Sequence, residues 1–160
     1  MSKIKFCSIL LLLSSSATPV HANNSVSLNY AIGKESGAES MHGVNVMIKH
    51  NINDFAFLVS GTYVQNITDN DSGYFKNKYA SLMPGVSYNL SKDLCFYGLA
   101  GLSAGSKVKD SQTHEIYGVA FGSGILYTLT DNIQFNAGYE LGIVDAREIN
   151  TFIVGLGYMF

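Results

Sequence analysis

One carboxyl group in this chain stands where a carboxyl group is costly. Glu140 lies in a stretch of alternating apolar and polar residues, and it shares its face with Gln134, Asn136 and Gly138. On such a face it could line a path for protons or ions, or it could pair with a basic residue. Lys49 has the matching parity in another alternating stretch. We expect a structural Glu140–Lys49 pair, because a buried charge that loses its partner destabilises a fold.

The residue types and their spacing give little support for a catalytic site or a metal site. Asp110, Ser111 and His114 supply the residue types of a hydrolase triad. A triad also needs an oriented base and an oxyanion hole, and a short polar stretch supplies neither. The 4 histidines show neither His-Glu-x-x-His spacing nor a cysteine partner. We therefore expect no catalytic residue, no metal site and no cofactor, and we do not expect an enzyme.

Two lysines offer binding chemistry instead. Lys107 and Lys109 lie in the same polar stretch as His114. Ammonium groups attract phosphates and acidic sugars. Contact with such an anion is one hypothesis for this pair, and simple solvation of both side chains is the other.

The elements that must position these residues follow a period of two. At the end of the chain, Phe152, Val154, Leu156, Tyr158 and Phe160 share one face, and the intervening residues, mostly small ones, share the other. Such alternation predicts a strand with two unlike faces. A large apolar outer face is typical of a strand that faces lipid.

Eight stretches show this alternation. They predict strands at 25–34, 43–50, 55–64, 79–90, 94–105, 116–129, 133–141 and 151–160. In the fifth stretch the sequence does not decide which face points outwards, because Phe96 and Leu102 share one face and Tyr97 and Leu99 share the other. Connections of three or four residues follow the second, fourth and sixth strands, whereas the others, at 35–42, 65–78, 106–115 and 142–148, are longer and polar. Short turns at one end and long loops at the other are typical of an outer-membrane barrel.

The hydrocarbon environment of such strands requires the sheet to close on itself. In hydrocarbon every backbone N–H and C=O must be paired, and a sheet achieves this only without edges. Eight strands leave an interior that side chains just fill. A soluble lipocalin-like barrel would put the apolar face inside, and would leave Asn136 and Glu140 on the outside. We predict an all-β fold, an eight-stranded antiparallel up-and-down transmembrane β-barrel, with a hydrophilic inner wall.

The start of the chain predicts export. Lys3 and Lys5 precede a short apolar run, and Val20-His21-Ala22 offers a cleavage site, which is the order of a secretory signal peptide. The run is shorter than the roughly 20 residues of a spanning helix. We expect residues 1–22 to be a cleaved signal and residues 23–160 to form the barrel.

The charge and the cysteine content of the chain limit which partners and which disulfides are possible. Loss of Lys3 and Lys5 would leave 8 basic and 12 acidic residues, a formal net charge of −4. No basic patch suits a phosphate backbone, so nucleic acid is not an expected partner. Cys95 would be the only cysteine left, which excludes an internal disulfide. Charged residues make up 14% of the chain, against about 25% in soluble domains.

With these strands in place, the chain resembles the Ail/Lom family of outer-membrane barrels, which includes outer-membrane protein X. The similarity runs in order through nearly all of the expected mature chain. It is carried by Gly43-Val44-Asn45, by residues 60–63, 79–88, 96–101 and 117–124, by Gly138-Tyr139-Glu140 and by residues 154–160. The terminal motif occurs in most outer-membrane barrels, whereas the ordered set is specific.

The resemblance implies a protein of the Gram-negative outer membrane. Its loops would act in adhesion, virulence or serum resistance by binding host extracellular matrix or complement regulators, and the alternative is a small structural or stress-related barrel without a dedicated ligand. Outer-membrane lipid and lipopolysaccharide would be partners, Lys107 and Lys109 being candidate contacts. Leu156, Tyr158 and Phe160 would be read by the barrel-assembly machinery. The loops are short for the family, and Met159 stands where a basic residue is common.

Overall fold

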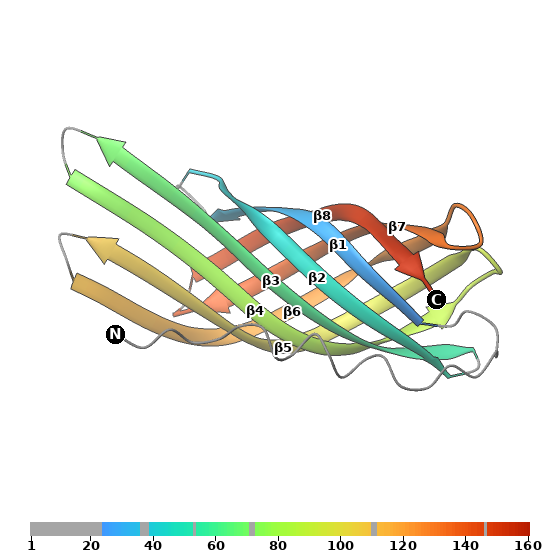
Figure 1. Cartoon of the computed structure of the whole chain (residues 1–160). Helices are drawn as coiled ribbons and strands as arrows, with labels where there is room; N and C mark the ends of the chain where they lie inside the picture. Colours follow the sequence, from blue (N-terminus) through green and yellow to red (C-terminus); the bar gives the residue numbers. More distant parts are fainter. Residues whose placement is uncertain (1–23, 36–38, 53, 71–72, 110–111, 146) are drawn as a thin grey trace, which may run out of the picture.

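Eight antiparallel strands form one closed barrel, with β8 paired to β1 (Figure 1). The computed structural model describes residues 24–35, 39–52, 54–70, 73–109, 112–145 and 147–160. The strands are β1 (Asn24–Glu35), β2 (Met41–Ile52), β3 (Phe55–Asn70), β4 (Gly73–Asn89), β5 (Leu94–Lys109), β6 (Gln112–Thr128), β7 (Ile133–Val144) and β8 (Arg147–Met159). The fold class predicted from the alternation is confirmed. The expected signal peptide lies outside the described residues.

The outer wall is apolar along every strand. On β1, for example, Val26, Leu28 and Tyr30 are exposed, whereas Ser27 and Asn29 are buried. Aromatic side chains gather at both ends of this wall: Phe55, Phe57, Tyr88, Phe96, Tyr127, Tyr158 and Phe160 at the short-turn end, and Tyr30, Tyr63, Tyr117, Tyr139 and Phe152 towards the other. Two aromatic belts around an apolar band match a barrel that spans a membrane. No helix in the described part of the chain is long and apolar enough to span one.

The inner wall is filled with side chains but is not wholly hydrophilic, which corrects the sequence prediction. Serine, asparagine, threonine and glutamate side chains are buried there as expected. Two apolar clusters share the interior with them. One comprises Met47, Leu58, Met83, Cys95, Tyr97, Leu99, Ala120 and Leu126, and the other Ala31, Met41, Val64, Tyr79, Val144, Ile149 and Ile153. An interior this narrow excludes water, so apolar side chains pack there as they do in an ordinary core.

The open question of the fifth strand is settled by these clusters. Tyr97 and Leu99 face inwards with 1% and 6% exposure, and Phe96 and Leu102 face outwards with 50% and 71%. Both faces of β5 are apolar because one meets lipid and the other meets the apolar part of the interior.

Three of the four predicted long loops are corrected. The β3–β4 ladder continues to Asn70↔Gly73, and the β5–β6 ladder to Lys109↔Gln112. The β7–β8 ladder ends at Val144↔Arg147, next to Asp145 with φ 49°. Aspartate tolerates this left-handed conformation better than most residues. The connection after β1 agrees better with the prediction, because β1 ends at Glu35 and β2 begins at Met41.

Candidate functional site

Glu140 lies inside the barrel, fully buried on β7. The Tyr79 hydroxyl of β4 donates to Glu140 Oε1 at 2.6 Å, and the Thr62 hydroxyl of β3 donates to Oε2 at 2.7 Å. Both donors lie across the interior from β7, because neither β3 nor β4 is its neighbour in the sheet. The carboxyl group therefore links opposite walls of the barrel.

Lys49 is also inside the barrel, but it does not pair with Glu140. Its ammonium group donates to Cys95 Sγ at 3.3 Å, and the Cys95 thiol donates to Asn89 Oδ1 at 2.6 Å. Asn89 closes β4 at the short-turn end, whereas Glu140 and its partners lie nearer the other end. The inward parity predicted for both residues is right, and the pairing between them is not found, because they stand at different heights.

The Glu140 contacts continue through an amide network. Asn45 Nδ2 donates to Thr62 Oγ1 at 2.9 Å and to Ser60 Oγ at 2.7 Å. Asn29 Nδ2 donates to Asn45 Oδ1 at 2.7 Å. One chain of hydrogen bonds thus runs from β1 through β2 and β3 to β7. A buried network of this kind fixes the register of the strands that it joins, although Asn29 Oδ1 at its β1 end has no hydrogen-bond partner among the described residues.

The Tyr97 side chain of β5 lies along the inner wall, over inward glycines of β6 and β7, the next two strands of the sheet. Tyr97 Oη donates to Asn136 Oδ1 at 3.0 Å. Its ring lies over the directly paired Gly124 and Gly138, since a Cβ atom added to either glycine would come within 2.4 or 2.1 Å of Tyr97 Oη. These inward glycines make room for a large ring in a narrow barrel.

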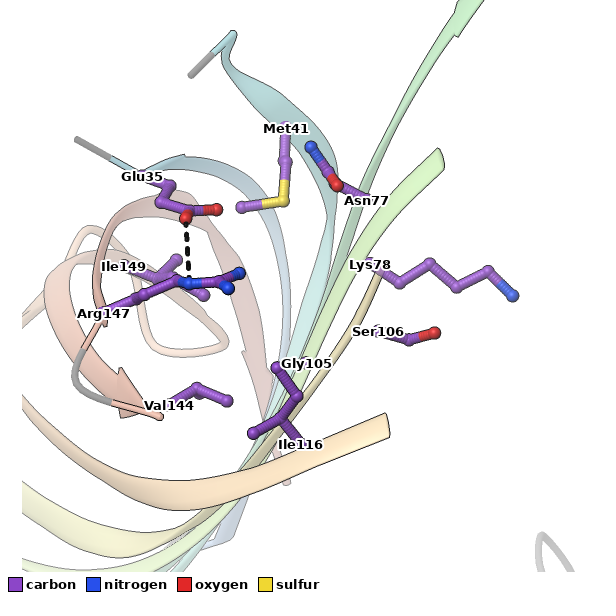
Figure 2. A pocket seen from close by; sticks show the side chains of 10 residues that line it. All are labelled: Glu35, Met41, Asn77, Lys78, Gly105, Ser106, Ile116, Val144, Arg147 and Ile149. Atoms are coloured by element: carbon purple, nitrogen blue, oxygen red, sulfur yellow. Dashed lines mark ion pairs between the residues drawn. The ribbon is translucent and has the colours of Figure 1, made fainter. Parts of the chain in front are cut away.

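A pocket opens at the end of the barrel opposite the short turns (Figure 2). Met41, Val144 and Ile149 line its apolar part. Arg147 Nε lies 3.9 Å from Glu35 Oε1 across it. The arginine side chain is 40% exposed, so this ion pair contributes little to stability.

Lys107, Lys109 and His114 lie in strand segments that extend beyond the closed part of the barrel. Lys107 and Lys109 belong to β5, opposite Asn77 and Phe75 of β4. His114 belongs to β6, opposite Lys107, while Asp110 and Ser111 lie outside the described residues. Among the residues that are described, no group of three or more histidines, cysteines or carboxylates could hold a metal ion.

Sequence reasoning missed the partners of Glu140. Tyr79 and Thr62 share inward parity with serines on their own strands, at Ser81 and Ser60, and this parity was the available signal. This parity predicts which face of the strand a side chain occupies, but it does not predict the position of that side chain along the barrel axis. No sequence feature of Glu35 or Arg147 predicted that the two residues meet at the end of the barrel opposite the short turns, which we call its mouth.

A closed eight-stranded barrel with an apolar outer wall, two aromatic belts and a filled interior defines a membrane-spanning β-barrel of the Gram-negative outer membrane. The family model described as "Outer membrane protein beta-barrel domain" matches residues 8–160. The chain belongs to this family of outer-membrane β-barrels.

Several curated relatives cover most or all of the chain. Outer membrane protein X of Escherichia coli K12 is 27% identical over the full length of both chains. The virulence membrane protein PagC of Salmonella typhimurium is 28% identical over 86% of each chain. The attachment invasion locus protein of Yersinia enterocolitica is 28% identical over 96% of each. These relatives are named for virulence, attachment and the outer membrane, and none of these names is that of an enzyme.

The fold also matches a solved structure. Ail of Yersinia pestis, in complex with the heparin analogue sucrose octasulfate, superposes with a TM-score of 0.76. The match covers 86% of this chain and 97% of that one at 22% identity, so it bears on the fold alone.

Proposed function

We propose that this protein is a surface barrel whose outer end binds host components, extracellular matrix or complement regulators, in attachment and serum resistance. The observation that carries the proposal is a sheet that projects beyond the barrel (Figure 1). The β2–β3 ladder stops at Gln65 and the β6–β7 ladder at Gly118, yet β3 to β6 continue to pair with one another. Five or six further residues on each edge strand extend about 15–20 Å.

The projecting sheet offers two binding features. Among the described residues, no further strand pairs with the outer side of 66–70 of β3 or of 112–117 of β6. Unpaired edges of this kind accept a strand from a partner. Lys107 and Lys109 are two residues apart on β5, so they share one face of the sheet. Their positive charge suits an acidic glycan.

Replacing both lysines tests the glycan contact. We expect Lys107→Ala/Lys109→Ala to elute from heparin at a clearly lower salt concentration than the wild type, because two charges leave the contact surface. The double variant Lys34→Ala/Lys92→Ala changes net charge equally and serves as the control. Equal elution of both double variants would remove these lysines from the contact.

The alternative is a small structural or stress-related barrel. It is favoured by the short connections, since only two residues separate β3 from β4 and β5 from β6. Expression in a non-adherent host strain, followed by cell-binding and serum-killing assays, separates the two functions. Gain of either phenotype supports the surface role. Correct assembly with neither phenotype supports the alternative.

We also propose that the barrel-assembly machinery reads Leu156, Tyr158 and Phe160. Leu156 and Tyr158 are exposed on the outward face of β8, and Phe160, directly after β8, is exposed as well. Phe160→Ala should lower the assembled barrel several-fold in cells, because this aromatic group is accessible before the barrel enters lipid. Heat-modifiable protein in outer-membrane fractions measures the effect, with Phe152→Ala on the same face as control. Equal losses in both variants would point to general instability of β8.

A further inference from the structure

The lipid-facing wall carries a hollow that neither attachment nor barrel assembly uses. Its volume is about 240 Å³. The register explains it: Tyr63 of β3, Ala80 of β4, Ala104 of β5 and Tyr117 of β6 stand side by side in one row. Because the two central side chains are methyl groups, the flanking rings form the walls of a slot and the alanines form its floor.

The rows above and below give the slot a polar end and an apolar end. The paired Lys78 and Ser106 lie two residues from the alanines towards the outer end of the barrel. The paired Leu82 and Leu102 lie two residues from the alanines towards the membrane centre. Leu82 and Leu102 are among the most exposed apolar side chains of the wall. The slot therefore runs from an ammonium group into the apolar band.

The height of the slot matches the outer membrane surface. Tyr88, in the belt at the short-turn end, and Lys78 are ten residues apart on β4. At about 3.3 Å per residue and a tilt of about 40°, they differ by about 25 Å in height, which is about the height of the apolar band. Lys78 thus lies where lipid headgroups begin, and the slot lies among the upper parts of the acyl chains.

Lys78 is available for a ligand. Figure 2 shows its side chain pointing away from the pocket at the mouth of the barrel. Within the described part of the chain its ammonium group makes no hydrogen bond or ion pair, whereas the neighbouring Tyr63 hydroxyl donates to Gln65 Oε1 at 3.2 Å. An ammonium group at this level attracts a phosphate.

We propose that the slot holds one acyl chain of a phosphorylated lipid of the outer leaflet, a lipid A, with its phosphate on Lys78. The apolar chain lies on Ala80 and Ala104 between the two tyrosine rings. This inference rests on the lipopolysaccharide partnership that the family resemblance implies, and it gives that partner a place on the wall that is distinct from Lys107 and Lys109.

Native mass spectrometry of the refolded barrel in detergent tests the slot with diphosphoryl lipid A and with the same lipid freed of phosphate. Lys78→Gln should weaken binding of the phosphorylated lipid about fivefold and leave the dephosphorylated lipid unchanged. Ala104→Leu fills the slot, so it should weaken binding of both lipids. Heat-modifiability on gels confirms that each variant is folded.

Two matched controls decide the outcome. Lys34→Gln removes an outward charge near the outer end of β1, and Ala137→Leu enlarges an outward residue of β7, and both should stay within twofold of the wild type. Equal loss in Lys34→Gln and Lys78→Gln would show diffuse attraction and overturn the proposal, as would unchanged binding in Ala104→Leu. Heparin elution of Ala104→Leu should match the wild type, so failure of the glycan proposal remains distinguishable.

Discussion

Replacing Glu140 with leucine is expected to lower the free energy of unfolding by about 2–4 kcal/mol. The substitution removes the acceptor of two buried hydroxyl groups, those of Tyr79 and Thr62. The Thr62 hydroxyl still accepts a hydrogen bond from Asn45, whereas the Tyr79 hydroxyl loses the carboxylate that accepts its proton inside the barrel. The temperature at which the compact band disappears on gels, and the urea midpoint in detergent, measure the loss.

A second substitution isolates the cause. Tyr79→Phe in the Glu140→Leu background removes the orphaned hydroxyl, so we expect it to recover a large part of the lost stability, because deleting both partners of a buried bond costs less than deleting one. Glu148→Leu, an exposed change, should stay within about 0.5 kcal/mol of the wild type. An unchanged gel shift in Glu140→Leu at raised temperature would remove Glu140 from the stabilising network.

Gly138→Ala is expected to destabilise the barrel by about 2–3 kcal/mol. The new Cβ atom would lie 2.1 Å from Tyr97 Oη but 3.3 Å from Tyr97 Cζ. The clash is therefore with the hydroxyl and not with the ring. In a Tyr97→Phe background the same substitution should cost less than about 1 kcal/mol, a coupling that urea titration of the four proteins measures.

Gly124→Ala is the matched control for this rescue. Its Cβ atom would lie 2.4 Å from the carbonyl oxygen of Ala137 and 2.5 Å from Tyr97 Cζ, and Tyr97→Phe relieves neither contact. We expect Gly124→Ala to stay destabilising in both backgrounds. Rescue of both glycine variants by phenylalanine, or of neither, would show that the ring does not lie over this glycine pair as described.

The faces of the strands were predictable from the sequence. Leu28 and Val154 alternate with small or polar residues, and they face outwards as predicted. The reason is that lipid and the barrel interior select different side chains at every second position. The same argument gave the even number of strands and the inward direction of Lys49 and Glu140.

The outer parts of β3 to β6 were not predictable in this way. Beyond Gln65 and Ser106 neither face of the sheet meets lipid, so the alternation that marks a strand fades there. Backbone pairing with neighbours then decides the structure, and it turned expected loops such as 106–115 into a projecting sheet.

The amino-acid sequence by itself determined the class of fold, the outward wall and the membrane that surrounds it, because these depend on a local period of two. The tertiary structure alone decided which groups meet inside and which gather on the wall. Tyr79 reaches Glu140, Tyr97 covers Gly138, and Lys78 stands above Ala80 and Ala104 because the register and closure of eight strands set relative heights. Those heights depend on all strand pairs together, and no single stretch of sequence encodes them.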